Sequence, residues 1–391
     1  MNSTASALKS TAIIQHSSER GWSGTFPQLD SERTMIIVFG ASEYKDKSEA
    51  LHELHKAFPR SRIIGCSTSG EIFGTRVMDG TLSVAIKRFD ATTVTTAIAP
   101  VRNADDSYRA GATLGEQLLR RGLRGVMVLS DGLNVNGTEL VHGLNSVLPE
   151  GTVLTGGLAG DGDRFKETWV LRNGLPESRI VSAMGFYGDQ VEIGHGSKGG
   201  WSPFGPERMI TRSQGNVLFE LDGTPALALY KKYLGDRSRE LPASGLLFPL
   251  AVRPSRGGSP MLVRTILAVS ETDQSLTFAG DIPEGWSAQL MRANFDWLVD
   301  ASAESAKASC ALDSPICEPL TIAVSCVGRR LILGERTEDE LRAAEEALSS
   351  AGRMIGMYSY GELSPHINGG RCELHNQTMT ITTIGERCID S

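Results

Sequence analysis

A single pattern occurs three times along the chain. An apolar run, a helix-like segment and a second apolar run that ends in a glycine-rich box begin at Met35, Val126 and Thr321. The boxes lie at residues 65–72, 155–162 and 356–363. A repeat indicates the architecture of a chain more directly than any single motif does. The pattern therefore predicts three β-α-β units. We expect their glycine turns to gather around one binding site.

Further apolar runs follow the first two units. Residues 81–89 and 92–99, and then 180–187 and 191–194, alternate like antiparallel strands. The sequence therefore predicts an α/β fold with mixed (α+β) sheets. It is built from duplicated β-α-β-ββ units in the N-terminal region and a related unit in the C-terminal region.

The length of 391 residues exceeds the usual size of one hydrophobic core. We expect a flexible tail over residues 1–30, an N-terminal domain over residues 31–225 and a C-terminal domain over residues 226–391. The boundary lies beside an apolar helix-like segment at residues 227–234. Residues 194–206 are rich in Gly and Pro, which predicts a loop, and we expect it to wall the binding site.

Composition limits the partners. The formal net charge is -7, which argues against a nucleic-acid partner because phosphate binding needs a basic face. No stretch approaches 18 consecutive apolar residues, and the N-terminus lacks the basic start and apolar core of a signal peptide. We therefore expect a cytoplasmic protein with no membrane partner. The six cysteines include no Cys-x-x-Cys pair, and in a cytoplasmic chain we expect reduced thiols.

The glycine-rich boxes differ from the motifs of two kinds of enzyme site. A dinucleotide-binding loop needs Gly-x-Gly-x-x-Gly between a strand and a helix, but the second box leads into a strand-like run at residues 167–171. Cys66 and Ser67 offer a nucleophile, yet a hydrolase elbow would read Gly-x-Ser-x-Gly and lead into a helix. We expect no enzymatic activity, and a hydrolase that uses Cys66 or Ser67 is kept as an alternative.

Small-ligand binding suits the boxes better. Glycine turns let backbone N–H and C=O groups approach a ligand closely. Glu71, Asp161 and Glu362 occupy equivalent places in the three boxes, so together they predict a site that can receive an amine. A single axial histidine is enough to bind haem iron, and His375 and His195 lie in strand-like or glycine-rich segments. These two histidines are the candidate iron ligands, in that order.

Four boxes resemble those of a known family. Residues 65–72, 156–161, 360–365 and 372–378 resemble, in order, the boxes of the FIST family, and the resemblance spans about residues 34–384. It implies a bacterial sensory module, with an N-terminal and a C-terminal FIST region, that binds a small ligand and acts on signalling partners. Residues 201–208 further resemble the stand-alone nitric oxide-sensing members of that family.

That second resemblance implies haem as cofactor, a response to nitric oxide, and a separate histidine kinase or cyclic-di-GMP enzyme as partner. Other members are suggested to bind amino acids, so a haem-free module for an amino acid or a similar metabolite is the alternative. A homo-oligomer is left open.

The predicted ligand pocket joins the glycine boxes, the loop at residues 194–206 and the last box. Its predicted residues are Cys66, Ser67, Gly70, Glu71, Gly157, Gly160, Asp161, Trp201, Phe204, Tyr360, Glu362 and Asn376.

Overall fold

The three repeats fold into three β-α-β units, in which the apolar runs form strands buried along almost their whole length. The computed structural model describes residues 9–241, 243–254, 261–312, 314–348, 353–366 and 369–388. In each unit two parallel strands flank one helix: β3 (Thr34–Gly40), α1 (Glu49–Ala57) and β4 (Arg62–Ser67); β9 (Leu123–Ser130), α3 (Gly137–Val147) and β10 (Val153–Leu158); β24 (Ile316–Cys326), α7 (Thr337–Ala347) and β25 (Arg353–Ser359).

Each unit continues with a hairpin and one long strand, and each also has a strand that pairs with the long one. The hairpins are β5 (Glu71–Phe73) with β6 (Arg76–Met78), β11 (Val170–Arg172) with β12 (Leu175–Glu177), and β26 (Gly361–Pro365) with β27 (Cys372–His375). The long strands are β7 (Thr81–Arg88), β13 (Ile180–Tyr187) and β28 (Met379–Arg387), and their outer partners are β1 (Thr11–Ser17), β8 (Thr93–Pro100) and β14 (Val191–Lys198). The mixed α/β fold class is confirmed.

The units exchange their hairpins in a ring. The hairpin of the second unit pairs with β4 of the first, that of the third with β10 of the second, and that of the first with β25 of the third. Each sheet therefore reads hairpin, second strand, first strand, long strand, outer strand, and β2 (Gly21–Trp22) extends the first sheet. The three units form one body, residues 9–198 and 295–388, with approximate threefold symmetry.

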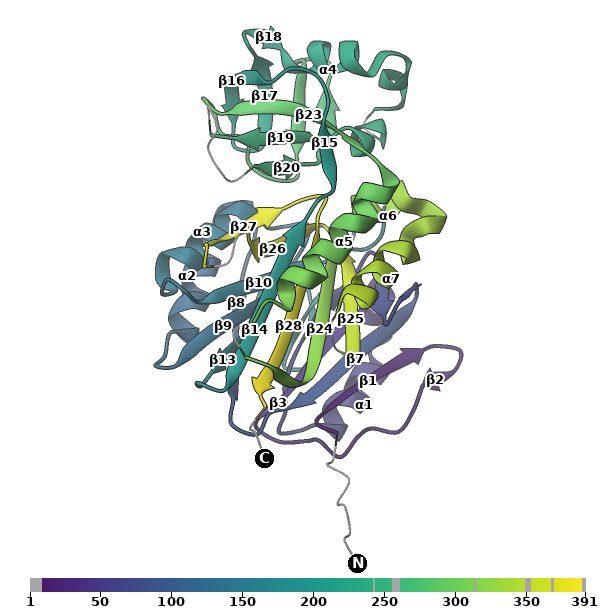
Figure 1. Ribbon diagram of the computed structural model, residues 1–391, viewed down its shortest axis with the longest axis vertical. Coiled ribbons are helices and arrows are strands. Elements are labelled where there is room, and N and C mark those ends of the chain that lie inside the picture. Colours follow the sequence, from purple (N-terminus) through teal and green to yellow (C-terminus); the bar gives the residue numbers. More distant parts are fainter. Residues whose placement is uncertain are drawn as a thin grey trace, which may run out of the picture.

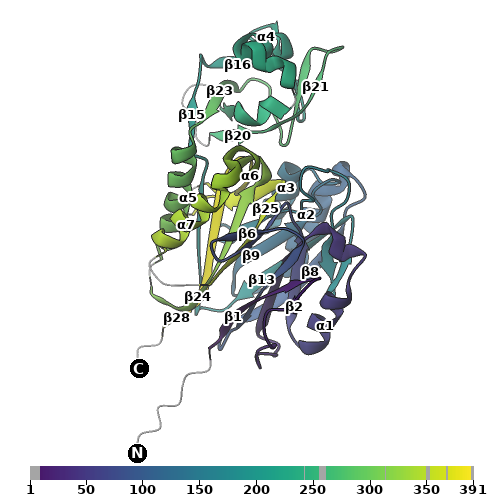
Figure 2. The same ribbon diagram turned by 90° about the vertical axis from the view of Figure 1, so that its right-hand side faces the viewer.

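The body has sheets inside and helices outside. Residues from all three units share one buried core, among them Phe39, Leu129 and Val324. The helices that cover the sheets are α1, α2 (Ser107–Leu118) with α3, and α5 (Phe295–Ser309) with α7. Figure 2 shows α5 and α7 on the side of the body opposite α1. In the described residues no helix is long and apolar enough to cross a membrane.

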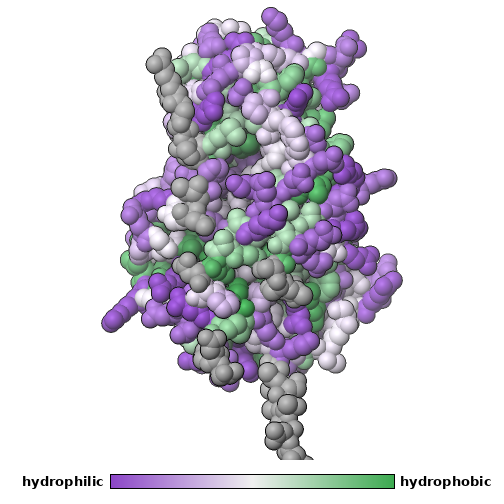
Figure 3. Space-filling model, in the orientation of Figure 1, coloured by the Kyte–Doolittle hydropathy of each residue, from purple (hydrophilic) through white to green (hydrophobic). Residues whose placement is uncertain are grey.

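A small unit, residues 201–293, stands on one end of the body (Figure 1). Its strands and helix are β15 (Trp201–Pro203), β16 (Arg208–Gln214), β17 (Val217–Leu221), β18 (Thr224–Pro225), α4 (Ala226–Leu234), β19 (Leu250–Arg253), β20 (Leu262–Arg264), β21 (Ile266–Ser270), β22 (Ser275–Phe278) and β23 (Ser287–Ala293). It has its own core, in which Leu227 and Tyr230 pack with Leu218 and Leu276. On the face seen in Figure 3, hydrophilic residues lie over both the small unit and the body.

The remaining short helices lie in the connections. They are α6 (Val327–Leu333) and the 3-10 turns η1 (Ser42–Lys45), η2 (Ala104–Asp106), η3 (Gly235–Glu240), η4 (Ala243–Leu247) and η5 (Gly334–Arg336).

Several sequence expectations need correction. The expected tail over residues 1–30 is wrong for its described part, because β1 pairs with β7 along its whole length. The boundary at residue 225 falls between β18 and α4, inside the small unit, so it separates no structural units. The expected loop at residues 194–206 consists largely of β14 and β15. Cys317 and Cys388, expected to be reduced, form a disulfide.

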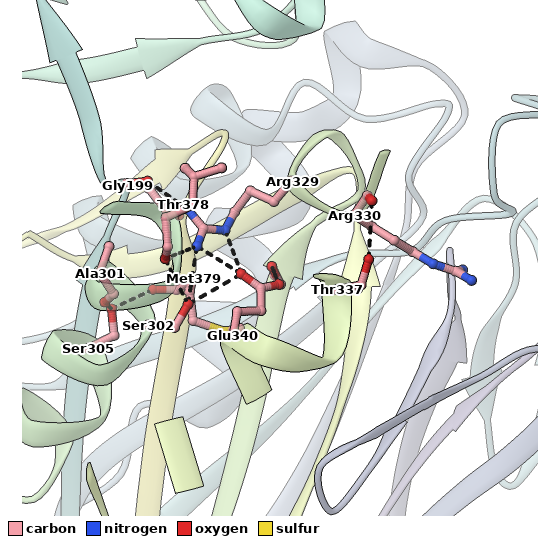
Figure 4. Close-up of polar contacts among 12 residues, drawn as sticks. Gly199, Ala301, Ser302, Ser305, Arg329, Arg330, Thr337, Glu340, Thr378 and Met379 are labelled. Carbon is pink, nitrogen blue, oxygen red and sulfur yellow. Dashed lines mark hydrogen bonds and ion pairs between the residues drawn. The ribbon is translucent and has the colours of Figure 1, made fainter. Parts of the chain in front are cut away.

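A buried ion pair holds the crossing between body and small unit (Figure 4). The Arg329 and Glu340 side chains are fully buried, with Nη2 2.8 Å from Oε2. The same guanidinium donates to the carbonyls of Gly199, 2.6 Å away, and Leu298, 2.7 Å away. Gly199 leads into the small unit and Leu298 follows the segment that leaves it, so one side chain fixes both passages of the chain.

The Glu340 carboxylate is fully hydrogen-bonded. Its Oε1 accepts bonds from the hydroxyls of Tyr358, at 2.7 Å, and Ser325, at 3.0 Å, while Ser302 donates to Oε2 at 3.2 Å. These partners lie on α5, β24 and β25. A buried charge pair survives removal from water only with this degree of hydrogen bonding.

We expect Glu340→Ala to lower the free energy of unfolding by about 3–5 kcal/mol, because it leaves the Arg329 charge buried without its partner. Urea denaturation followed by circular dichroism measures the change. Glu345→Ala, an exposed position on the same helix, is the matched control and should change little. A loss for Glu340→Ala no larger than that of a surface pair, below about 1 kcal/mol, would contradict this assignment.

Candidate functional site

The three glycine boxes meet on the approximate threefold axis, and they bind one another. The Gly160 N–H donates to the Ser67 carbonyl at 3.0 Å, joining the first two boxes. Tyr358 joins the third box to the first, since its N–H donates to the Gly70 carbonyl at 2.9 Å and its carbonyl accepts the Ser69 N–H at 2.7 Å. The boxes therefore come together as expected, but their backbone groups close the ring of units instead of forming one ligand pocket.

Glycine is required where the boxes touch. A Cβ at Gly160 would collide with the Ser69 hydroxyl, and one at Gly157 would lie 2.6 Å from the Met357 methyl. These two glycines serve the packing between units, so their predicted place in a ligand pocket is wrong.

Glu71 and Glu362 have matching environments in the first and third units. Glu71 accepts bonds from the Thr68 hydroxyl and from both the N–H and hydroxyl of Thr81. Glu362 accepts the corresponding bonds from Ser359 and Thr378. Burial raises the pKa of Glu71 to about 7 and that of Glu362 to about 8. Both carboxyl groups serve turns inside the body, so neither is a ready partner for a ligand amine.

Asp161 has a different role from the other two carboxylates. It accepts the backbone N–H groups of Phe165, Lys166 and Glu167 at 2.8–2.9 Å, and a hydrogen bond from the Tyr360 hydroxyl. Burial by itself would raise its pKa, but these hydrogen bonds outweigh it and the pKa is lowered. The charged carboxylate thus fixes a loop and a tyrosine, and the expected equivalence of the three acids holds only for Glu71 and Glu362.

Two cavities lie beside the axis. The polar cavity, about 660 Å³, is lined by Gly70, Glu71, Asp161 and charged residues such as Asp79 and Arg330. Arg330 already pairs with both carboxylate oxygens of Asp79 at 2.6–2.8 Å. The polar cavity is therefore largely an arrangement of charges that satisfy one another.

The interdomain cavity, about 670 Å³, lies between the body and the small unit and is mostly apolar. The body contributes the loop after β9, the start of α6 and Tyr360, and the small unit contributes β21, β22 and the residues around Asp281. Ligand sites are typically concave, mainly apolar and placed where domains meet. By these criteria this cavity is the better site.

An aromatic pair forms one wall of the interdomain cavity. The rings of Phe165 and Tyr360 stack with centroids 4.6 Å apart and planes 12° from parallel. Phe165 is 52% exposed and has a φ of +50°, a conformation that costs energy for a bulky residue. Asp161 holds both rings in place, since it binds the Phe165 N–H and the Tyr360 hydroxyl. Strain maintained at a solvent-exposed phenylalanine is typical of a binding surface.

The charge in the interdomain cavity is of one sign. Asp163 and Asp281 are its charged residues, and none of its described lining residues is Lys, Arg or His. A ligand with several negative groups would meet carboxylates there and no cation.

The predicted iron ligands lie elsewhere. His375 is buried in β27, with Nε2 2.9 Å from the Ser364 carbonyl and its ring against His366, and burial lowers its pKa to about 4. His195 is buried in β14, and burial lowers its pKa. Neither histidine lines either cavity. No cluster of three or more His, Cys, Asp or Glu suited to a metal ion occurs within the described ranges. These residues do not fit haem as they are placed.

The predicted nucleophiles are also unsuited to their role. Cys66 is fully buried with Sγ 3.4 Å from the Met357 sulfur, and burial raises the pKa of its thiol. Ser67 is fully buried and its hydroxyl accepts the Trp169 N–H at 3.0 Å. Neither can meet a substrate in this arrangement, so the structure offers no support for the hydrolase alternative.

The other predicted pocket residues divide among three places. Tyr360 lines the interdomain cavity. Trp201 packs against the α5 and α6 region and donates to the Gln377 carbonyl at 2.8 Å, and Phe204 packs on the core of the small unit. Asn376 is buried near them without lining a cavity. The residues that the sequence did not reveal as site residues are Phe165, Asn136, Thr265 and Asp281.

One signal in the sequence pointed at part of this set. Asn136-x-x-Glu139 is a capping-box pattern, and Asn136 does cap α3, accepting the Glu139 N–H at 3.2 Å. Its Nδ2 also donates to Asp281 across the cavity, at 3.1 Å. A pattern identifies the cap, but only the fold brings the small unit to it.

Comparison with known protein families agrees with the resemblance in the sequence. Residues 34–224 match the model of the FIST N domain, and residues 226–365 match that of the FIST C domain. No curated protein sequence matches the chain. The two models divide at the predicted boundary, residue 225. That division falls inside the small unit, so the interdomain cavity draws residues from both models.

We expect stability to fall as pH rises from about 5 to 8, partly because of Glu362. Its folded pKa of about 8 exceeds its ordinary value of 4.5, so the stabilisation is complete below pH 4.5 and is lost as pH rises through 8. Glu362→Gln removes this titration and should flatten the thermal midpoint against pH. The exposed Glu345→Gln is the control, and an unchanged slope in Glu362→Gln would disprove the shift.

Proposed function

The chain belongs to the FIST family, whose domains are sensory small-ligand-binding domains in signalling, and we propose that the interdomain cavity is its sensory site. One observation carries the proposal: an apolar cavity of about 670 Å³ opens between body and small unit, walled by the Phe165–Tyr360 stack. This volume lies within the range of sites that bury a small molecule.

The contacts around the cavity suggest how occupancy is transmitted. The small unit is held by polar contacts to the body, such as Asn136 with Asp281 and Arg264 with the Leu374 carbonyl at 2.9 Å. Beside them, both amide atoms of Asn376 and the Oε1 of Gln377 are buried without a hydrogen-bond partner among the described residues. Each unpaired buried group costs about 1–3 kcal/mol.

An interface with unpaired amides is not optimised for a single position of the small unit. A ligand that contacts both sides of the cavity binds more tightly when the small unit is in one position than in another. It therefore shifts the equilibrium between the two positions. We propose that this shift is the signal. The protein that receives this signal would be a separate signalling protein, such as a histidine kinase or a cyclic-di-GMP enzyme. The family resemblance supports this choice of partner.

The resemblance of residues 201–208 to the nitric oxide-sensing members implies haem binding and a response to nitric oxide. The site gives no support for either. The interdomain cavity has no lining histidine and no cation for the two haem propionates. The proposal of a sensory role therefore rests on the cavity and on the family, and it invokes no cofactor.

We expect Nile red, a neutral dye that fluoresces in apolar surroundings, to bind the native protein at one saturable site. Phe165→Ala should weaken binding roughly threefold to tenfold, because an aromatic contact contributes about 0.5–1.5 kcal/mol. Phe295→Ala is a matched control, since Phe295 is 45% exposed and lines neither cavity. Equal loss in both variants, or no saturable binding, would refute the site.

We expect titration with haemin to give no Soret band that depends on the two histidines. His375→Ala and His195→Ala should have the same spectrum as the native protein, because neither ring reaches a cavity. A saturable band lost in one of these variants would reinstate the haem sensor.

A further inference from the structure

The polar corner of the interdomain cavity has a carboxylate oxygen without a protein partner among the described residues. Asp281 accepts one recorded side-chain hydrogen bond, from Asn136 Nδ2 to Oδ1, and its backbone carbonyl accepts the Arg264 Nε–H at 3.1 Å. Its Oδ2 has no recorded partner among the described residues. Asp281 is partly exposed where it lines the cavity, so this oxygen is a carboxylate acceptor beside the apolar space.

A second unpaired group lies in the same lining. Thr265 is 5% exposed, and its Oγ1 is buried without a hydrogen-bond partner in the described structure. It lines the cavity beside Gly280 and Asp281. Buried hydroxyls are normally hydrogen-bonded, so the unpaired Thr265 hydroxyl is a local weakness in the cavity wall beside Asp281.

The nearest guanidinium is already committed. Arg264 is buried and donates to the carbonyls of Asp281 and Leu374, it makes no recorded ion pair with Asp281, and it does not line the cavity. With Asp163 at the rim, the cavity presents two carboxylates and no lining cation. Arg264 offsets part of the Asp281 charge, but its N–H groups are used by backbone carbonyls, so a protonated amine is favoured over a carboxylate or phosphate ligand.

We propose that the interdomain cavity takes an amine: a small molecule with one protonated amino group and an aromatic or branched apolar body, and no acidic group. This rests on the proposed function and specifies its ligand class. The amino group donates to the Asp281 carboxylate. The apolar body packs against the Phe165–Tyr360 stack, Phe278 and Ile266, which line the same space.

The site that sequence reasoning assigned to an amine is thus replaced by another. Glu71, Asp161 and Glu362 accept hydrogen bonds at both carboxylate oxygens, whereas Asp281, in the small unit, lines the interdomain cavity and has only one oxygen so engaged. A carboxylate is still the group that binds the amine, as the sequence predicted, but that carboxylate belongs to Asp281.

Three probes of one shape test the proposal on the full chain by isothermal titration calorimetry at pH 7.5: phenethylamine, phenethyl alcohol and 3-phenylpropionate. The amine should bind at least about tenfold more tightly than the alcohol, and the carboxylate should bind most weakly, since only the ammonium adds an ionic attraction to its hydrogen bond with the carboxylate. The amine should also displace Nile red.

Two variants assign the selectivity. Asp281→Asn keeps an acceptor for Asn136 but removes the charge, and should abolish most of the preference for the amine over the alcohol. Thr265→Val is nearly isosteric and keeps the Asp281 charge, so it should leave the preference for the amine over the alcohol unchanged. Asp236→Asn, which changes the same charge on a side chain that is 97% exposed, should leave all three affinities unchanged.

The outcomes separate the two proposals. If Nile red binds in the Phe165-dependent way but the alcohol binds as tightly as the amine, or the carboxylate binds best, the amine assignment is overturned and the sensory site stands. If neither Nile red nor any probe binds, the sensory site fails first. Should Asp281→Asn fail to fold, the probe series on the native protein still decides.

Discussion

The crossing of the chain between body and small unit depends on one buried ion pair. Arg329 and Glu340 are both fully buried, and the guanidinium also holds the carbonyls of Gly199 and Leu298, on the two passages of the chain between body and small unit. Because an unpaired charge cannot remain in that interior, the geometry of the crossing is determined by the pair. The interdomain cavity exists because the small unit is held against the body without being packed closely onto it.

The exchange of hairpins explains why the glycine boxes are not the ligand site. Each box ends a strand that must accept a hairpin from another unit, so its backbone groups are engaged in closing the ring, as in the bonds between Gly160 and Ser67. The same closure buries Glu71 and Glu362 and raises the pKa of each. Asp161 differs because a longer loop follows it in the second unit. Its carboxylate binds the backbone of that loop, which places Phe165 at the interdomain cavity.

The division of polar groups around the cavity links recognition to signalling. Asp281 and Thr265 belong to the small unit, whereas Phe165 and Tyr360 belong to the body, so an occupant that contacts both pairs bridges the two. The unpaired amide of Asn376 and the unpaired Oε1 of Gln377 lie at the same interface, where Gln377 Nε2 donates to the Leu246 carbonyl of the small unit. A bridging ligand can therefore exchange one set of contacts for another at small net cost, which is the condition for a population shift.

The sequence by itself determined the three β-α-β units, the paired strands after them, the mixed fold class and the family, because these depend on local periodicity and on short ordered boxes. It also determined that Glu71 and Glu362 are equivalent, since the repeat places them at the same step. Only the tertiary structure decided which unit each hairpin joins, because short strands such as β5 carry no local signal for a partner hundreds of residues away. It alone placed Phe165, Thr265 and Asp281 around one cavity, and it removed Cys66, His195 and His375 from any surface a ligand can reach, since burial is a property of the closed ring and not of the segment.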